Sequence, residues 1–114
     1  MQYQHTSLAA EDWFTLSLFE QLGNVGSEVG RARKWQHKNQ GIFENSFFRA
    51  IELLSLTIDD KRWKSQLKEL CRAKEVLGDA FYGGKLYDSD FESLEKYFYH
   101  FAVAAQNNKT INEK

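Results

Sequence analysis

The segment from Ile42 to Ile58 restricts the fold of this chain more than any other. Its apolar side chains recur every three or four residues, the spacing of an α-helix, at Phe43, Phe47, Ile51, Leu54 and Ile58. A second apolar row widens this surface beyond one stripe, with Phe48, Leu53 and Leu56. A helix that is apolar on more than one side is normally enclosed by other helices. The segment therefore predicts the central helix of a bundle.

A long first helix is predicted before this segment. It begins at Leu8, where Ser7 can cap it, and its apolar positions keep helical spacing for about 28 to 30 residues. The pattern continues across Gly23, Gly26 and Gly30, which share one face where another backbone could approach closely. The alternative is a break or kink near Gly23 to Gly26, because each glycine costs about 1 kcal/mol relative to alanine in a helix.

Two more helices are predicted after the central one. The third covers about Lys61 to Tyr82, and the fourth begins at Ser89, where Glu92 completes an S-x-x-E capping box. Residues 1–6 and 107–114 are polar and are predicted to be loose. The absence of proline favours long helices, and short connections favour antiparallel neighbours. The predicted fold is all-α: one domain of residues 1–114 that forms an up-down-up-down antiparallel four-helix bundle with a long first helix.

Composition argues against several classes of protein. A net charge of −1 is unsuited to coating nucleic acid by charge alone. The single Cys71 excludes an internal disulfide and a multi-cysteine metal site, and it suits a reducing cytosol. No apolar run approaches the ~20 residues of a membrane-spanning helix. No glutamate lies three residues before His5, His37 or His100, as the Glu-x-x-His of di-iron bundles requires. We therefore expect a cytoplasmic protein with no metal, no cofactor and no membrane partner.

Arginine and glutamate side chains lie three residues apart at several helical positions. Each pair can meet on its own helix: Glu28 with Arg31, Arg49 with Glu52, and Glu69 with Arg72. The simpler interpretation is a set of solvated or half-buried ion pairs. The alternative is a polar pocket between helices that binds a small anion, with these candidate residues: Glu28, Arg49, Glu52 and Arg72.

A basic segment closes the predicted first helix. Its cationic and histidine side chains surround one aromatic, Trp35, and they are Arg31, Arg33, Lys34, His37 and Lys38. Cations are favoured at a helix C-terminus, so a solvated helix end explains the segment. Basic residues beside an aromatic can also bind a phosphate backbone and stack a base, so RNA is an alternative partner.

Arg31 and His37 have five residues between them. This spacing resembles the Arg-x4–6-His motif of the HEPN proteins, which are small and all-helical. The resemblance implies metal-independent cleavage of RNA at a dimer interface. Arg31 would then steady the phosphate and His37 would be the general base that activates the ribose hydroxyl.

A wider likeness concerns the bundle pattern. The segments Glu20–Ala32 and Phe48–Leu54 resemble helices of small four-helix bacterial proteins. These include the bundles encoded within intervening sequences of large ribosomal RNA and the helical partners of minimal nucleotidyltransferases. The resemblance implies the fold and leaves the activity open.

The function expected from these observations is that of a non-catalytic interaction or binding module. Its partner is expected to be a second copy of the chain or another protein, because elongated bundles often bury apolar surface in a dimer. Aromatic side chains near the ends of the bundle are candidates for that surface: Trp13, Trp63 and Tyr97 to Tyr99. The alternatives are an RNA-cleaving or RNA-binding protein that uses Arg31 and His37, and a bundle that binds a small anion.

Overall fold

The computed structural model describes residues 11–112, with side chains described as far as residue 107. A helical turn at residues 11–13 comes first. The elements that follow are α2 (Leu18–Trp35), α3 (Gln40–Asp59), the 3-10 helix η1 (Lys61–Gln66), α4 (Leu67–Phe81) and α5 (Phe91–Asn112). No strand occurs within residues 11–112, and the all-α prediction is confirmed.

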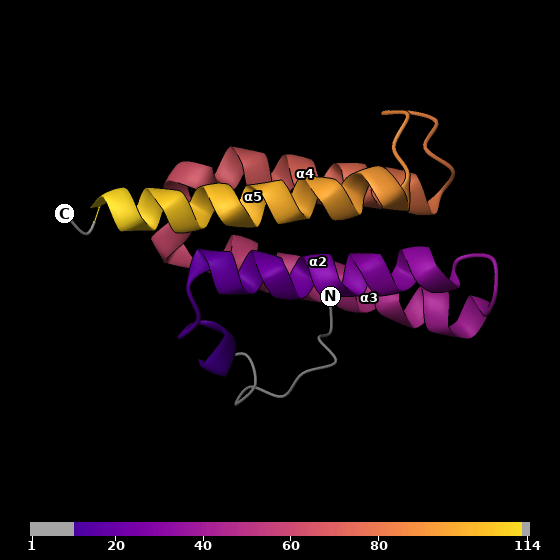
Figure 1. Cartoon of the computed structure of the whole chain (residues 1–114), viewed down its shortest axis with the longest axis horizontal. Coiled ribbons are helices and arrows are strands. Elements are labelled where there is room, and N and C mark those ends of the chain that lie inside the picture. The colour runs from indigo at the N-terminus through magenta and orange to yellow at the C-terminus, as the bar shows by residue number, and fades with distance from the viewer. Residues whose placement is uncertain (1–10, 113–114) are drawn as a thin grey trace.

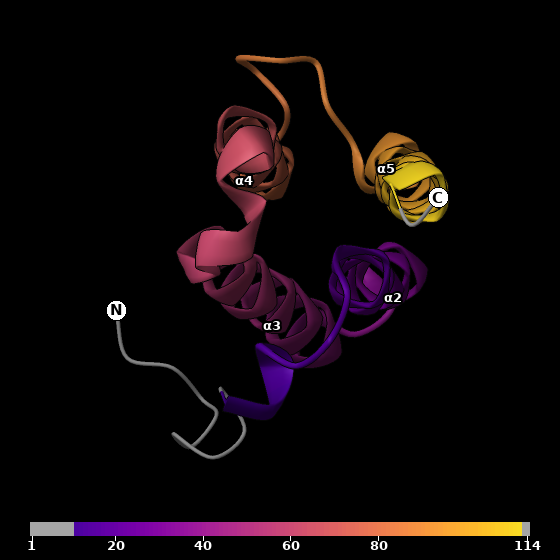
Figure 2. The same cartoon turned by 90° about the vertical axis from the view of Figure 1, so that its left-hand side faces the viewer.

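The helices run alternately up and down the long axis of the molecule (Figure 1). Viewed along that axis, α2, α3, α4 and α5 stand at the four corners of a bundle (Figure 2). α2 packs against both α3 and α5, α3 also packs against α4, and α4 and α5 contact each other far less. α2 and α3 thus each pack against two other helices, and the Phe-rich α3, predicted as the central helix, contributes more buried residues than α2 does. The enclosure of α3 is incomplete, because Phe48, part of its predicted second apolar row, is 48% exposed.

An aromatic cluster closes one end of the core. Phe47 stacks on Phe81 with ring centroids 4.1 Å apart, and Phe43 stacks on Phe81 at 5.6 Å. Phe91 meets Phe43 edge to face at 5.2 Å. These offset and edge-on arrangements are favourable for aromatic rings, and they join α3, α4 and the start of α5.

A buried polar network fixes the other end, where α2 begins and α3 gives way to η1. The Gln21 amide is completely buried, and its Nε2 donates to the Trp13 carbonyl at 2.8 Å and to Asp60 Oδ2 at 3.1 Å. Its Oε1 accepts from Trp63 Nε1 at 2.9 Å. Arg62 donates to both carboxylate oxygens of Asp60. The two tryptophans are therefore fixed by hydrogen bonds inside the protein.

The predicted first helix is interrupted within the described chain. Its start at Leu8 behind Ser7 lies outside the described residues, as do the predicted loose residues 1–6. Within the described chain, the helical turn ends in bends at residues 14–16, and α2 starts only at Leu18. Ser17 and Glu20 form the capping box there, each side chain bonded to the other's backbone N–H. The predicted alternative, a break near Gly23 to Gly26, is wrong, because both glycines lie inside continuous α2.

The third and fourth helices also differ from the predictions in detail. The third is divided into η1 and α4, with a kink at Trp63 (φ −104°, ψ 31°). Asp90, not Ser89, caps α5, because Asp90 Oδ1 accepts from Ser93 N at 2.7 Å. Ser89 turns inward and donates to the Asp79 carboxylate. α5 continues to Asn112, so the chain is helical well past residue 107, where a loose tail was predicted.

Candidate interaction surface

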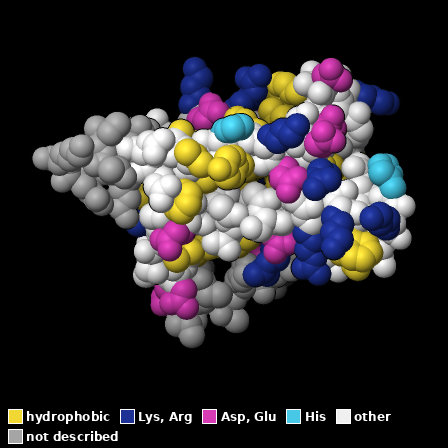
Figure 3. Space-filling model, viewed as in Figure 1, with side chains coloured by type: hydrophobic (Ala, Val, Ile, Leu, Met, Phe, Trp, Pro, Cys, Tyr) yellow, Lys and Arg dark blue, Asp and Glu magenta, His cyan; other side chains and the backbone are white. Residues whose placement is uncertain are grey.

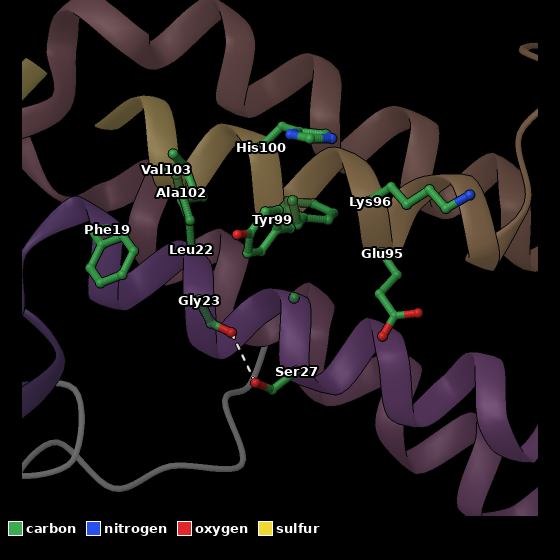
Figure 4. A pocket seen from close by; sticks show the side chains of 12 residues that line it. Phe19, Leu22, Gly23, Ser27, Glu95, Lys96, Tyr99, His100, Ala102 and Val103 are labelled. Atoms are coloured by element: carbon green, nitrogen blue, oxygen red, sulfur yellow. Dashed lines mark hydrogen bonds between the residues drawn. The ribbon is translucent and has the colours of Figure 1, made fainter. Parts of the chain in front are cut away.

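A groove of about 480 Å³ runs between α2 and α5. Figure 4 shows Phe19 on α2 and Tyr99 and Val103 on α5 around this groove, with Gly23 between them. We call this feature the α2/α5 groove. Tyr99 is 66% exposed although it lies beside apolar neighbours. An exposed apolar hollow with a polar rim is typical of a protein interaction site.

The glycines of α2 have different roles in the packing against α5. A Cβ added at Gly26 would stand 3.3 Å from the Phe98 Cβ, and one at Gly30 would collide with the Glu95 carboxylate. A Cβ added at Gly23 would meet nothing within 4 Å. Gly26 therefore lets α5 approach closely, as the glycine spacing predicted, whereas a Cβ at Gly30 would meet only the end of the flexible Glu95 side chain. Gly23 has no such role inside the molecule and leaves the groove open.

Gly23→Ala is expected to stabilise the protein by about 0.5–1 kcal/mol, because alanine is the better helix former and the added methyl group has free space. Gly26→Ala is the matched control, and we expect it to give no gain or a loss, since its methyl group presses on Phe98. Chemical denaturation of both variants measures the difference. Equal changes in the two variants would contradict this account of the glycines.

The rim of the groove is polar. Glu95 on α5 forms an ion pair with Arg33 on α2, with Arg33 Nε 2.5 Å from Glu95 Oε1. Both side chains are 40% or more exposed, so solvent weakens the pair. Lys96 and His100 line the groove from the same helix as Glu95. The rim thus carries both signs of charge around an apolar floor.

Only one of the predicted surface aromatics is freely exposed. Trp13 is 7% exposed and donates to Thr57 Oγ1 at 3.2 Å, and Trp63 is half-buried in the polar network. Tyr97 is half-buried and donates its hydroxyl to Glu69. Burial, together with that hydrogen bond, raises the pKa of Tyr97 above its ordinary value. Phe98 is completely buried, so it is a structural residue like Trp13, Trp63 and Tyr97, and Tyr99 is the member that faces outward.

The predicted RNA residues Arg31 and His37 are both exposed near the end of α2. A basic hollow of about 390 Å³ is lined by Gly30, Arg33, Lys34, His37 and Lys38, without Arg31. Figure 3 shows Lys and Arg side chains gathered toward this end of the molecule, and apolar side chains nearer the other end.

The predicted anion-binding residues are divided between two places. Glu28 on α2 and Arg49 on α3 form an ion pair of 3.1 Å, and Glu52 is buried one turn further along α3. Arg72 instead lies over the Tyr87 ring, with its guanidinium carbon 4.9 Å from the ring centre. It lines a groove between α4 and α5 that includes none of the other three residues. Glu28 is thus paired with Arg49 on another helix, whereas spacing within one helix suggested Arg31 as its partner.

Sequence reasoning predicted a short connection between the third and fourth helices but not the side chains that it displays. Asp79, buried near the end of α4, accepts from the backbone N–H of Leu86 and of Tyr87, each at 3.0 Å. Tyr82 and Leu86 project from this loop and are 79% and 83% exposed. The Gly83-Gly84 pair marked a helix end in the sequence, but no local pattern shows which side chains a loop displays.

Within residues 11–112, no three His, Cys, Asp or Glu side chains are grouped as metal ligands. None of the described helices has the length and apolar character that crossing a membrane would need. Comparisons with protein-family models, with curated proteins and with solved structures gave no match, so the functional argument rests on this chain's own residues.

Proposed function

We propose that this protein is a non-catalytic helical-bundle module that associates with a second copy of itself through the α2/α5 groove. The observation that carries the proposal is the exposed groove itself, held open at Gly23, where a helix-weakening residue has no packing role inside the chain. A partner side chain packed over Gly23 would explain why a residue without a Cβ occupies this position. It would also cover Phe19, Tyr99 and Val103, and burial of apolar surface is the main driving force of association.

Electrostatics permits this association. The net charge of −1 leaves little long-range repulsion between two copies. Lys96 and Glu95 on the rim provide opposite charges that a second copy could match. The RNA-cleaving alternative has less support, because His37 lines the basic hollow without Arg31. The small-anion alternative has less support because Arg72 lies apart from Glu28 and Arg49.

Tyr99→Glu is expected to weaken self-association by about 10- to 100-fold, because it places a charge where an aromatic side chain would be buried. The measurement is sedimentation velocity over a dilution series. Asn45→Glu is the matched control, since it adds the same charge at an exposed position of α3. The wild-type and control proteins should dissociate at the same concentration. A wild-type protein that sediments as a monomer throughout the series would overturn the proposal.

A further inference from the structure

The loop between α4 and α5 displays the two most exposed large apolar side chains of the described chain, Tyr82 and Leu86. We call this pair the loop knob. A hollow of about 610 Å³ lies beside it, lined by Glu75, Gly78, Asp79, Lys85 and Tyr87 as well as by the two knob residues. Large apolar side chains with this exposure, set around a hollow, are typical of a surface that another protein covers.

Hydrogen bonds and two glycines hold the loop in a conformation that exposes the knob. The Asp79 carboxylate accepts hydrogen bonds from Leu86 N, Tyr87 N and Ser89 Oγ, all at 3.0 Å. The Asp79 carbonyl accepts from Gly84 N at 2.8 Å. Gly83 and Gly84 have φ values of 103° and 75°, which suit glycine. Leu86 is therefore exposed by a defined backbone conformation with satisfied hydrogen bonds.

The knob and the α2/α5 groove are separate surfaces, because the groove and the hollow beside the knob share no lining residue. In Figure 1 the loop between α4 and α5 stands at one end, whereas α2 begins and α5 finishes toward the other end. The groove lies between the first half of α2, from Phe19 to Ser27, and the α5 residues from Glu95 to Val103. A contact with two-fold symmetry pairs one patch with itself, whereas two different patches that complement each other pair head to tail.

We propose that the loop knob of one copy occupies the α2/α5 groove of the next, so that the copies assemble head to tail. This inference rests on the proposed self-association and names its second surface. The groove of about 480 Å³ is mostly apolar and can accept the Leu86 side chain with the edge of the Tyr82 ring.

The charges around the two surfaces are complementary. Lys85 lies in the loop beside Leu86, and Glu95 stands on the rim of the groove. Glu75 lies beside the knob, and the groove presents Lys96 to it. A knob inserted into the groove thus brings carboxylates and ammonium groups together at its edge, which favours this partner over a like-charged one.

Mixing two variants tests the head-to-tail arrangement. Leu86→Glu disables the knob and keeps the groove, and Tyr99→Glu disables the groove and keeps the knob. Each variant alone should be a monomer, and a one-to-one mixture should form a heterodimer that grows no further. Native mass spectrometry distinguishes the two chains by mass. Both replaced side chains are more than 60% exposed, so the fold should be kept, and circular dichroism verifies this.

The outcomes separate this inference from the proposed function. A heterodimer in the mixture supports the head-to-tail contact. An oligomer that survives in Leu86→Glu overturns the role of the knob and leaves self-association standing. Two monomeric variants that stay monomeric when mixed overturn the knob-in-groove pairing. A monomeric wild-type protein overturns both proposals.

Discussion

Gln21→Leu is expected to destabilise the protein by about 3 kcal/mol, although leucine nearly preserves the volume of the side chain. The amide of Gln21 is completely buried and makes three hydrogen bonds, to the Trp13 carbonyl, to Asp60 Oδ2 and from Trp63 Nε1. Leucine would remove the amide to which these three groups bond. A buried polar group that is left without a hydrogen bond costs about 1–3 kcal/mol. For a chain of this length, the loss corresponds to a fall in Tm of about 12 °C.

Chemical denaturation monitored by tryptophan fluorescence measures this effect directly, because Trp13 and Trp63 belong to the network. Gln40→Leu is the matched control. Gln40 is exposed at the start of α3, and its amide donates to the half-buried Glu44 at 2.7 Å. We expect this control to change the free energy of unfolding by less than about 0.5 kcal/mol. Similar losses in the two variants would show that the buried network adds no stability of its own.

The contribution of this network to stability should depend on pH, because Asp60 belongs to it. Burial alone would raise the pKa of Asp60, but hydrogen bonds from Arg62 and Gln21, with the Arg62 charge, hold that pKa below its ordinary value. A carboxyl whose pKa is lower in the folded state stabilises the fold above its unfolded pKa of about 3.9, and loses that contribution as the pH falls through the lowered folded value. Gln21→Leu removes one of these hydrogen bonds, so its stability should decline less steeply on acidification below about pH 4 than that of the wild type.

The sequence determined the class of fold because helical spacing is a local property. The apolar rows of residues 42–58 identified α3 almost to its ends, and the structure places it at Gln40–Asp59. The same reasoning extended the first helix too far. Phe14, Leu18 and Leu22 keep helical spacing across the break, so periodicity alone could not show it. The Ser17 and Glu20 capping box was the local signal that marked the true start.

Other features depend on tertiary contacts that spacing does not contain. Ser89 and Asp90 are both good helix caps, and the hydrogen bond from Ser89 to Asp79 leaves the capping role to Asp90. The ion pair between Glu28 and Arg49 joins two helices, whereas spacing within one helix suggested Arg31 as the partner of Glu28. The glycine strip was visible in the sequence, but the difference between Gly23 and its neighbours required the position of α5.

Gly84→Ala is the second large effect that we expect, with a loss of about 3 kcal/mol in stability. Gly84 has a φ of 75°, which an alanine adopts at a cost of about 1–2 kcal/mol. Its added Cβ would also collide with the backbone carbonyl oxygen of Ser89, which cannot move aside as a flexible side chain would. The loop must therefore rearrange and give up hydrogen bonds to Asp79.

Gly83→Ala distinguishes the cost of a positive φ from the cost of a steric collision. Gly83 also has a positive φ, of 103°, but a Cβ there would meet nothing within 4 Å. It should therefore lose only about 1–2 kcal/mol and keep the loop in place. Because Tyr82 and Leu86 flank these glycines, Gly84→Ala should also weaken self-association when measured well below its unfolding temperature, whereas Gly83→Ala should retain it. If a folded Gly84→Ala protein assembled normally, the conformation of this loop would not matter for the contact. That result would contradict the proposal that the knob is part of the interface.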